Sequence, residues 1–476
     1  MALMEASRWA ANAAVAALLC GCFSPDDPPL GADTDDASST GTDASGPPSG
    51  SGPESSGSTS TDPGTTNPTA TDPTDTDPTD PTDPTDTDPT DPTTTGPTTT
   101  GPTETGPEPA CGDGAATADE LCLDVTPNSL TVPPGPVDVA LGDLSSNGLL
   151  DIAVIAIGGM PNQENRFVVL EADGVGGFVE EHNLAIASAA GRVRLADLDQ
   201  DDDLDAVVNG NDLIRLRNQG SFFNASVVLS NVFGNSFDLS DVFIADLNGD
   251  DIMDIAYTEA YGRGWLAGVL SNGNWQSATE NNFPGPGEGA SGMAAAALSA
   301  GDDIDALMFN QYSSGSIALV NDGSGSFTPG PSLSLCPGNV SGVRYGEIAD
   351  FNDDGFGDVV VSCMDGDGAV SLGEAGGFAA PIPLPLAGAF KPSVADLDGD
   401  GDPDVLLTSR TLDRAVMFIN DGSGGFELSD IQFMAPGPVW GAVAGDVNDD
   451  GAMDVVVISN DGASDPGRVD VYTAEP

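Results

Sequence analysis

The sequence predicts an all-β protein: a seven-bladed β-propeller of four-stranded antiparallel blades, preceded by a long disordered stalk. A short acidic loop recurs seven times at intervals of about fifty residues, and each copy lies between two apolar runs. A tract of Asp, Thr, Pro, Ser and Gly precedes the first copy. A period of this length is typical of solenoids, propellers and repeat arrays, whose units cannot bury their apolar faces alone.

Each repeat unit has a pattern of four strands. A short apolar strand precedes the acidic loop, a run rich in Val, Ile and Leu follows it, and a third strand leads into a Gly-rich turn. An aromatic residue after that turn starts the fourth strand. The second runs, such as Val455–Ile458, lack alternation, as expected of strands covered on both faces. Turns such as Asn420–Phe426 contain the Asp and Gly residues that hairpins with positive φ need.

The two ends of the repeat region predict how the ring closes. The last unit ends at its third strand, Arg468–Thr473, and lacks a fourth. The segment Asn128–Val132 precedes the first unit and belongs to no other. We expect it to complete the last blade, so that the ring has no open sheet edge.

Three regions precede the propeller, which we assign to residues 127–476. Residues 1–22 contain an apolar run of signal-peptide length that ends in Leu19-Cys20-Gly21-Cys22. This ending resembles a bacterial lipobox and implies lipidation at Cys22, a lipid anchor and a place on the outer membrane or cell surface. Ordinary secretion with cleavage nearby is the alternative, and translation could begin at Met1 or Met4.

Residues 23–110 form a Thr/Asp/Pro-rich linker with no apolar periodicity to bury, so we expect disorder. Its prolines and like charges favour an extended chain that could reach on the order of 250 Å. Residues 111–126 contain Cys111 and Cys122 in a spacing that resembles a small cysteine motif of secreted myxobacterial proteins. We predict a hairpin closed by a Cys111–Cys122 disulfide, and a separate metal site is the alternative.

The charge balance excludes several kinds of partner. The chain has 76 acidic and 12 basic residues, a net charge of −64. Nucleic-acid binders need basic stripes, and electrostatic docking on anionic lipid needs them too, so we expect no nucleic-acid partner and no membrane contact beyond the anchor. A chain with this negative charge favours the binding of cations.

The acidic loops place carboxylate and amide oxygens at positions 1, 3, 5 and 9 of a tight turn, where all of them can face one hard cation. Calcium takes six to eight oxygens, at about 2.3–2.6 Å, and a backbone carbonyl and water would complete the shell. Five loops keep the full set, which predicts about five calcium sites. Their ligands are Asp197, Asp199, Asp201 and Asp205; Asp246, Asn248, Asp250 and Asp254; Asp350, Asn352, Asp354 and Asp358; Asp396, Asp398, Asp400 and Asp404; and Asp446, Asn448, Asp450 and Asp454.

Two loops depart from this pattern. The first has Asp143, Ser145, Asn147 and Asp151, of which two are charged, so we expect weak metal binding there. The fourth begins at Ala297 and keeps only its last acid, Asp305, which predicts that the metal is lost.

Position 6 of a full loop needs a left-handed turn. Three full loops have Gly there, and the other two have Asp202 and Asp251, which we expect to be more strained. The alternative to calcium is that the acids only solvate turns. That alternative explains one loop but not a fixed spacing, and three or four close carboxylates would repel one another without a cation.

The paired acidic loop and Gly-rich turn are similar to those of the FG-GAP/VCBS repeat family, which includes the head propeller of integrin alpha subunits. The resemblance covers residues 137–476. It implies calcium in the hairpin between the first and second strands of each blade. Because such an ion neutralises charge and binds only the folded form, we expect a mainly structural role. The resemblance also implies ligand binding on the face opposite these hairpins.

Counting back five or six residues from each loop gives a candidate ligand patch of Arg192, Arg344, Tyr345, Phe390, Lys391 and Trp440. Strand-end packing and charge balance are the alternative. Cys336 and Cys363 flank the fifth loop, and we favour a disulfide over two free thiols.

We therefore expect a monomeric, calcium-binding cell-surface lipoprotein that recognises a protein or a glycan, and no enzymatic activity. An extracellular polysaccharide-degrading enzyme on a propeller scaffold is the alternative. The sequence contains one histidine, His182, and no Ser-His pair or other catalytic constellation stands out.

Overall fold

The computed structural model describes residues 122–475, apart from 159–163, 187–189, 211, 231–238, 260–264, 270–278, 283–289, 297, 299–303, 312–314, 339–341, 365 and 461–465. The predicted signal peptide, Cys22, the linker and most of the small cysteine hairpin lie outside the described residues. Cys122 is disulfide-bonded, whereas its predicted partner, Cys111, also lies outside them. Within the described ranges, no helix has the length and hydropathy of a membrane span.

The described strands form seven four-stranded sheets and one two-stranded hairpin. We name each larger sheet by its first strand. The first three comprise β2 (Pro136–Gly142), β3 (Asp151–Ala156), β4 (Asn165–Ala172) and β5 (Phe178–Ile186); β6 (Ala190–Ala196), β7 (Asp205–Gly210), β8 (Asp212–Asn218) and β9 (Phe223–Ser230); and β10 (Leu239–Ala245), β11 (Asp254–Glu259), β12 (Trp265–Val269) and β13 (Thr279–Asn282).

The next three sheets follow the same order along the chain. They comprise β14 (Ala290–Ala296), β15 (Asp305–Asn310), β16 (Ser316–Asn321) and β17 (Phe327–Leu333); β18 (Val343–Ala349), β19 (Asp358–Cys363), β20 (Gly368–Ser371) and β23 (Ile382–Leu384); and β24 (Ala389–Ala395), β25 (Asp404–Ser409), β26 (Arg414–Asn420) and β27 (Phe426–Met434). The two-stranded hairpin of β21 (Gly373–Glu374) and β22 (Gly377–Phe378) lies between β20 and β23 in the chain.

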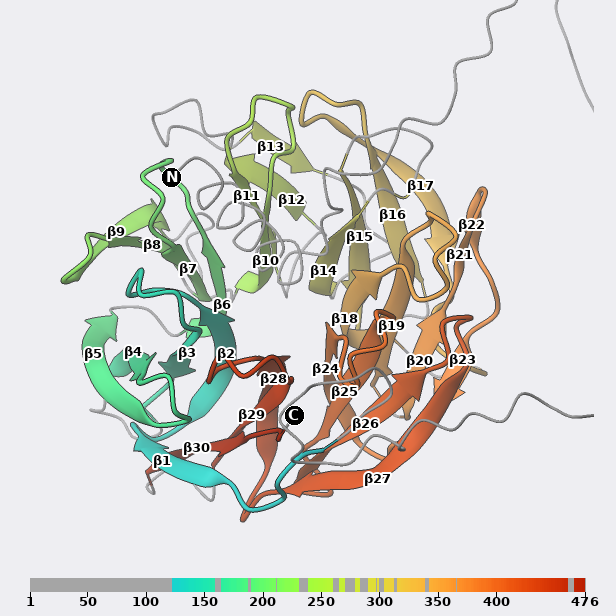
Figure 1. Cartoon of the computed structure of the whole chain (residues 1–476). Coiled ribbons are helices and arrows are strands. Elements are labelled where there is room, and N and C mark those ends of the chain that lie inside the picture. Colours follow the sequence, from blue (N-terminus) through green and yellow to red (C-terminus); the bar gives the residue numbers. More distant parts are fainter. Residues whose placement is uncertain are drawn as a thin grey trace, which may run out of the picture. The chain divides into compact units, whose positions relative to one another are not determined.

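The sheets surround a common centre. Their first strands contact one another in the order β2, β6, β10, β14, β18, β24 and β28 (Val439–Gly445), and β28 contacts β2 in turn. Figure 1 shows these strands toward the middle and the fourth strands at the periphery. Strand neighbours within each sheet run antiparallel, as in the β2 and β24 sheets. The prediction of an all-β propeller built from four-stranded antiparallel blades is confirmed.

The β28 sheet contains both ends of the described chain. It comprises β28, β29 (Asp454–Ser459), β30 (Gly467–Tyr472) and, as its outermost strand, β1 (Asn128–Val132). β1 pairs antiparallel with β30 from Asn128 opposite Val471 to Val132 opposite Gly467. The prediction that Asn128–Val132 completes the last sheet is therefore confirmed.

The second strands are the fully buried elements of the core. Every residue of β3, β7, β15, β19, β25 and β29 is buried. Their apolar side chains pack in clusters that join neighbouring sheets: Val154 and Val456, for example, belong to one cluster of the β2 and β28 sheets. Both faces of these strands are covered, which explains why their sequences show no alternation. The acidic loops are thus attached to fully buried strands.

Candidate metal centre

Each described acidic loop is held between two fixed points. Its first residue follows the first strand directly, as Asp396 follows β24, and its ninth residue opens the second strand, as Asp404 opens β25. The same relation holds for the loops that begin at Asp143, Asp197, Asp246, Asp350 and Asp446. The sequence period therefore places equivalent oxygen atoms at equivalent points of neighbouring sheets.

The carboxylate at position 1 organises the loop around itself. In six loops the backbone N–H of position 6 donates to its Oδ2 over 2.8–3.1 Å. In five of them, the N–H of position 5 donates to its Oδ1. These bonds fix the path of the loop backbone around the first carboxylate.

In the six loops that are fully described, two positions adopt the left-handed backbone conformation. Position 6 has φ between 63° and 98°, and this includes Asp202 at 67° and Asp251 at 63°. Position 4 has φ between 53° and 73°, and residues other than Gly occupy it in four loops. The sequence predicted the turn at position 6. It missed position 4, where Gly249 and Gly399 were the available signals.

The ninth residue is a fully buried carboxylate that ties three parts of the sheet together. It is 0 % exposed in the described loops. Its Oδ2 accepts the N–H of position 2 over 2.7–3.1 Å in six loops. Its Oδ1 accepts an N–H at or just beyond the end of the third strand over 2.6–3.0 Å. This aspartate thus has a backbone role in addition to the ligand role that its spacing predicts.

The fourth loop separates these two roles. Asp305 keeps the pattern although the loop lacks acids at positions 1, 3 and 5: Oδ2 accepts Leu298 N–H at 3.0 Å, and Oδ1 accepts Asn321 N–H at 2.7 Å. The backbone role of position 9 therefore does not require the other ligands.

A buried asparagine at the end of the third strand links the loops of neighbouring sheets. Nδ2 of Asn420 donates to the carbonyl of Phe351 in the β18 loop at 2.8 Å and to Pro403 of its own loop at 3.1 Å. Asn218 and Asn321 make the equivalent pair of bonds, one to the loop of the preceding sheet and one to their own loop. Neighbouring acidic loops are therefore connected through a single buried side chain.

The donor set of the β24 loop fits a hard cation. Carboxylate oxygens of Asp396, Asp398 and Asp404 all lie within 4.8 Å of one another, a separation that a calcium ion with ligands at about 2.4 Å on opposite sides would span. Burial, with a smaller contribution from the nearby carboxylates of Asp398 and Asp396, raises the pKa of Asp404 to about 7. Two hydrogen bonds leave lone pairs on the Asp404 carboxylate for a cation.

Other loops share parts of this chemistry. Burial, followed by neighbouring carboxylates, raises the pKa of Asp358 to about 6 and that of Asp454 to about 7. These features are expected where oxygen ligands are assembled for a positive charge. The residues that would hold calcium are those at positions 1, 3, 5 and 9.

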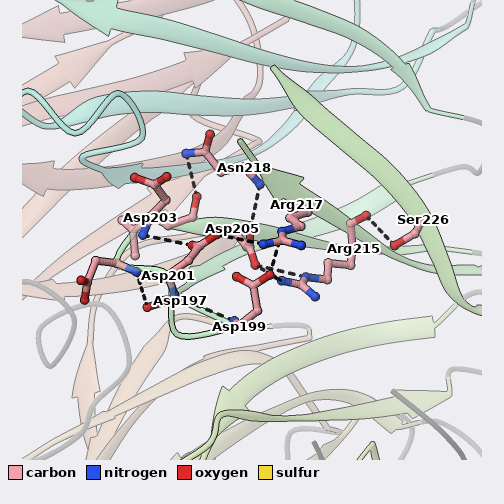
Figure 2. Close-up of polar contacts among 11 residues, drawn as sticks. Asp197, Asp199, Asp201, Asp203, Asp205, Arg215, Arg217, Asn218 and Ser226 are labelled. Atoms are coloured by element: carbon pink, nitrogen blue, oxygen red, sulfur yellow. Dashed lines mark hydrogen bonds and ion pairs between the residues drawn. The ribbon is translucent and has the colours of Figure 1, made fainter. Parts of the chain in front are cut away.

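The β6 loop differs because two arginines reach into it (Figure 2). Arg215 on β8 contacts Oδ2 of Asp205 at 2.5 Å and Oδ2 of Asp199 at 3.0 Å. Arg217 contacts Oδ2 of Asp199 at 2.7 Å and Oδ2 of Asp201 at 3.0 Å. Oδ1 of Asp199 is buried without a hydrogen-bond partner, so the loop still presents oxygen, but two guanidinium charges offset part of its negative charge.

Sequence reasoning missed both arginines, although a signal was present. Arg215 and Arg217 lie three residues and one residue before Asn218 at the end of the third strand. The equivalent positions before Asn420 are Met417 and Ile419. Two charges at positions that are apolar in a sister repeat indicate a local partner, here the carboxylates of the preceding loop.

The structure divides the candidate ligand patch into buried and accessible parts. Arg192 is buried, with Nε 3.2 Å from Asp241 Oδ1, and Lys391 is buried against Asp138. Arg344, Tyr345 and Trp440 are half-buried. The sequence prediction missed Asp138 and Asp241, which lie five residues before their loops, as Arg192 and Lys391 do. It also missed Arg410, which follows β25. The fifth loop is flanked as expected by a disulfide between Cys336 and Cys363.

Comparison with known proteins gives a family match in the C-terminal part of the chain. The FG-GAP-like repeat model matches residues 350–407 and 396–457, which contain the loops that begin at Asp350, Asp396 and Asp446. This part therefore carries FG-GAP-like repeats. Among curated proteins, none matches this chain in sequence.

Two solved structures illustrate the similarity of fold. The crystal structure of BBS1N in complex with ARL6DN, soaked with mercury, has a TM-score of 0.51 at 10% identity and covers 74% of this chain and 96% of that chain. A streptogramin B lyase structure has a TM-score of 0.49 at 13% identity and covers 75% of this chain and 100% of that chain. At such low identity the first match supports the fold alone, and the second carries no argument about function.

Proposed function

We propose that this chain is a calcium-stabilised, seven-bladed propeller that acts as a recognition module for a protein or glycan, and that it is not an enzyme. The observation that carries the proposal is the β24 loop, where three carboxylates converge within 4.8 Å at the junction of a first and a second strand. The cyclic contacts of the first strands and the pairing of β1 with β30 support a closed ring of seven blades.

Calcium would act mainly as a structural ion. The loops of the β10, β18, β24 and β28 sheets fit it best, because no arginine contact like that in the β6 loop appears among the described ion pairs. We propose weaker binding in the β6 loop, where arginines share the carboxylates, and in the β2 loop, which has fewer charges. An ion that binds only the folded form stabilises it by mass action.

The setting of the module follows from the N-terminal sequence. A lipid anchor at Cys22 and an extended linker would hold the propeller away from an outer membrane or cell surface as a monomer. Extracellular calcium modules bind at about 10⁻⁴–10⁻³ M, which suits such a location. The many carboxylates of the chain also suit an extracellular location, where calcium is abundant.

The test of recognition uses the full mature chain in millimolar calcium. We would screen it against a glycan array and against extracellular proteins, and assay the same preparation for polysaccharide hydrolysis. Saturable binding without turnover is the expected result. Turnover of any polysaccharide at a rate above the uncatalysed background would instead support the enzyme alternative, and absence of binding partners in both screens would contradict the recognition function.

A further inference from the structure

Two arginines and two aromatic rings form a cluster at the starts of three neighbouring first strands. Arg344 and Arg410 lie over the ring of Phe390, with Cζ 5.4 and 4.8 Å from its centroid, and Cζ of Arg410 lies 3.7 Å from the Trp440 centroid. Phe390 and Trp440 meet edge to face at 5.9 Å. We name Arg344, Phe390, Arg410 and Trp440 the mouth cluster.

The mouth cluster lies at the opposite end of the first strands from the acidic loops. Arg344, Phe390 and Trp440 each lie six residues before the first residue of their loop. Arg410 directly follows β25, and the opposite end of β25 begins with the loop residue Asp404. The first strands have a register irregularity at this point, for example between Val343 and Tyr345 and between Val439 and Gly441. Bulges of this kind re-aim side chains and are frequent beside binding sites.

Among the described residues, neither arginine of the mouth cluster has an acidic partner. Nε of Arg344 and Nε of Arg410 are buried and have no hydrogen-bond partner, and neither side chain occurs among the ion pairs of the described residues. Burial and the nearby Arg344 charge lower the pKa of Arg410. In a chain with 76 acidic and 12 basic residues, two adjacent guanidinium groups without a carboxylate are unexpected on charge statistics alone.

The charges beneath the mouth cluster are already balanced. Three cations face three acids there: Arg192, Arg194 and Lys391 against Asp138, Asp241 and Glu347. Arg192 also stacks on Tyr345 at 4.1 Å, and Tyr345 meets Phe390 edge to face at 5.1 Å. The deeper layer therefore has no surplus acid to offer, and the two positive charges of the mouth cluster remain uncompensated.

We propose that the mouth cluster binds the carboxylate group of a small, otherwise uncharged ligand. Planar guanidinium groups pair with carboxylates through parallel N–H donors, and stacking on Phe390 and Trp440 fixes their orientation in advance. The net charge of −64 disfavours a polyanion, so a single carboxylate fits better than a highly charged polymer. This inference rests on the proposed recognition function and names the chemistry of its ligand.

The test compares D-glucuronate with D-glucose as probes for the calcium-loaded full chain, using calorimetry or ligand-observed NMR. We expect binding of glucuronate only. Arg344→Gln and Arg410→Gln should each weaken it about tenfold or more, the usual loss for one hydrogen bond to a charged group. Arg410→Lys keeps the charge but loses the planar fork, so it should also weaken binding. Arg414→Gln, on β26 of the same sheet, is the control. It should leave glucuronate binding unchanged, since Arg414 pairs with Gln432.

Folding and function are checked separately in this design. Melting temperatures of the variants must match the wild type within a few degrees, and Arg410→Lys serves where Arg410→Gln does not fold. Equal binding of glucose and glucuronate, no binding of either probe, or glucuronate binding that survives both arginine substitutions would overturn the inference. If the screens find a ligand whose binding ignores these substitutions, the recognition function stands while the carboxylate site falls.

Discussion

Arg215 on β8 donates from Nη2 to Oδ2 of Asp205 at 2.5 Å and from Nε to the same atom at 3.1 Å. In the other described loops, Oδ2 of this ninth residue accepts the backbone N–H of position 2. A side-chain cation thus occupies a carboxylate oxygen that elsewhere serves the backbone. With Arg217 on Asp199 and Asp201, the β6 loop contains an internal substitute for part of the charge of a metal ion.

Removing these arginines should strengthen calcium binding at the β6 loop. Calcium affinity rises with the number of charged ligands, and Arg215→Gln with Arg217→Gln frees three carboxylates. We expect one additional calcium ion per chain in equilibrium dialysis at limiting calcium. The control is Arg414→Gln, which contacts no loop. An unchanged calcium content would show that the arginines do not compete with the ion.

The backbone role of position 9 predicts a calcium-independent loss of stability in the fourth loop. Asp305→Asn places an amide NH₂ group against a backbone N–H donor, which leaves a buried donor unpaired and costs about 1–3 kcal/mol. The denaturation midpoint should fall equally with calcium and with chelator. Asp404→Asn is the matched variant, and its loss should be larger in calcium. Equal responses of the two variants to calcium would contradict a ligand role for Asp404.

The buried lysine of the central layer predicts a pH dependence. Burial, together with Arg192 and Arg194, lowers the pKa of Lys391 to about 8, against an opposing effect of Asp138; Glu347 also faces this group. Because the folded form releases this proton more readily than the unfolded chain, Lys391 contributes increasing stability as the pH rises from about 8 toward 10.5. The melting temperature of the wild type should therefore rise relative to that of Lys391→Met over this window. A melting-temperature difference that stays constant over this pH window would show that the pKa of Lys391 is not lowered.

Closure of the ring by β1 predicts which face of that strand matters. Val132 is buried in the cluster that contains Ile458 and Val469, whereas Thr131 is exposed. Val132→Asp buries a carboxylate without a partner, a change that costs several kcal/mol or expels the strand. Hydrogen exchange of the β30 amides should accelerate strongly in Val132→Asp and little in Thr131→Asp. Equal protection in both variants would mean that β1 does not secure the sheet.

The sequence predicted the parts of this architecture that the repeat imposes. Buried second strands, acidic loops between first and second strands, and the completion of the last sheet by Asn128–Val132 all follow from aligning the repeats. Each depends on hydrophobic burial or on turn residues, whose signals are local and occur several times. Repetition removes the ambiguity that a single short strand such as Val405–Leu407 would have.

Contacts that break the repeat were not predicted. Arg215 and Arg217 required comparison of third strands between repeats, and Asp138 and Asp241 required a search for acids as well as bases at one position of the first strand. The double role of position 9 could not be read from spacing, because a ligand and a backbone acceptor are the same residue type. Asp305 reveals that role only when its hydrogen bonds are known.

The most direct test of the calcium account is the melting temperature of the full chain in millimolar calcium and in excess chelator, with the bound metal quantified before and after. Four well-fitting sites, each contributing about 1 kcal/mol at that concentration, should raise the melting temperature on the order of 5 °C. The account predicts that the melting temperature falls by this amount in chelator and recovers when calcium is added back. An identical melting temperature in both buffers, with no metal bound before chelation, would contradict it.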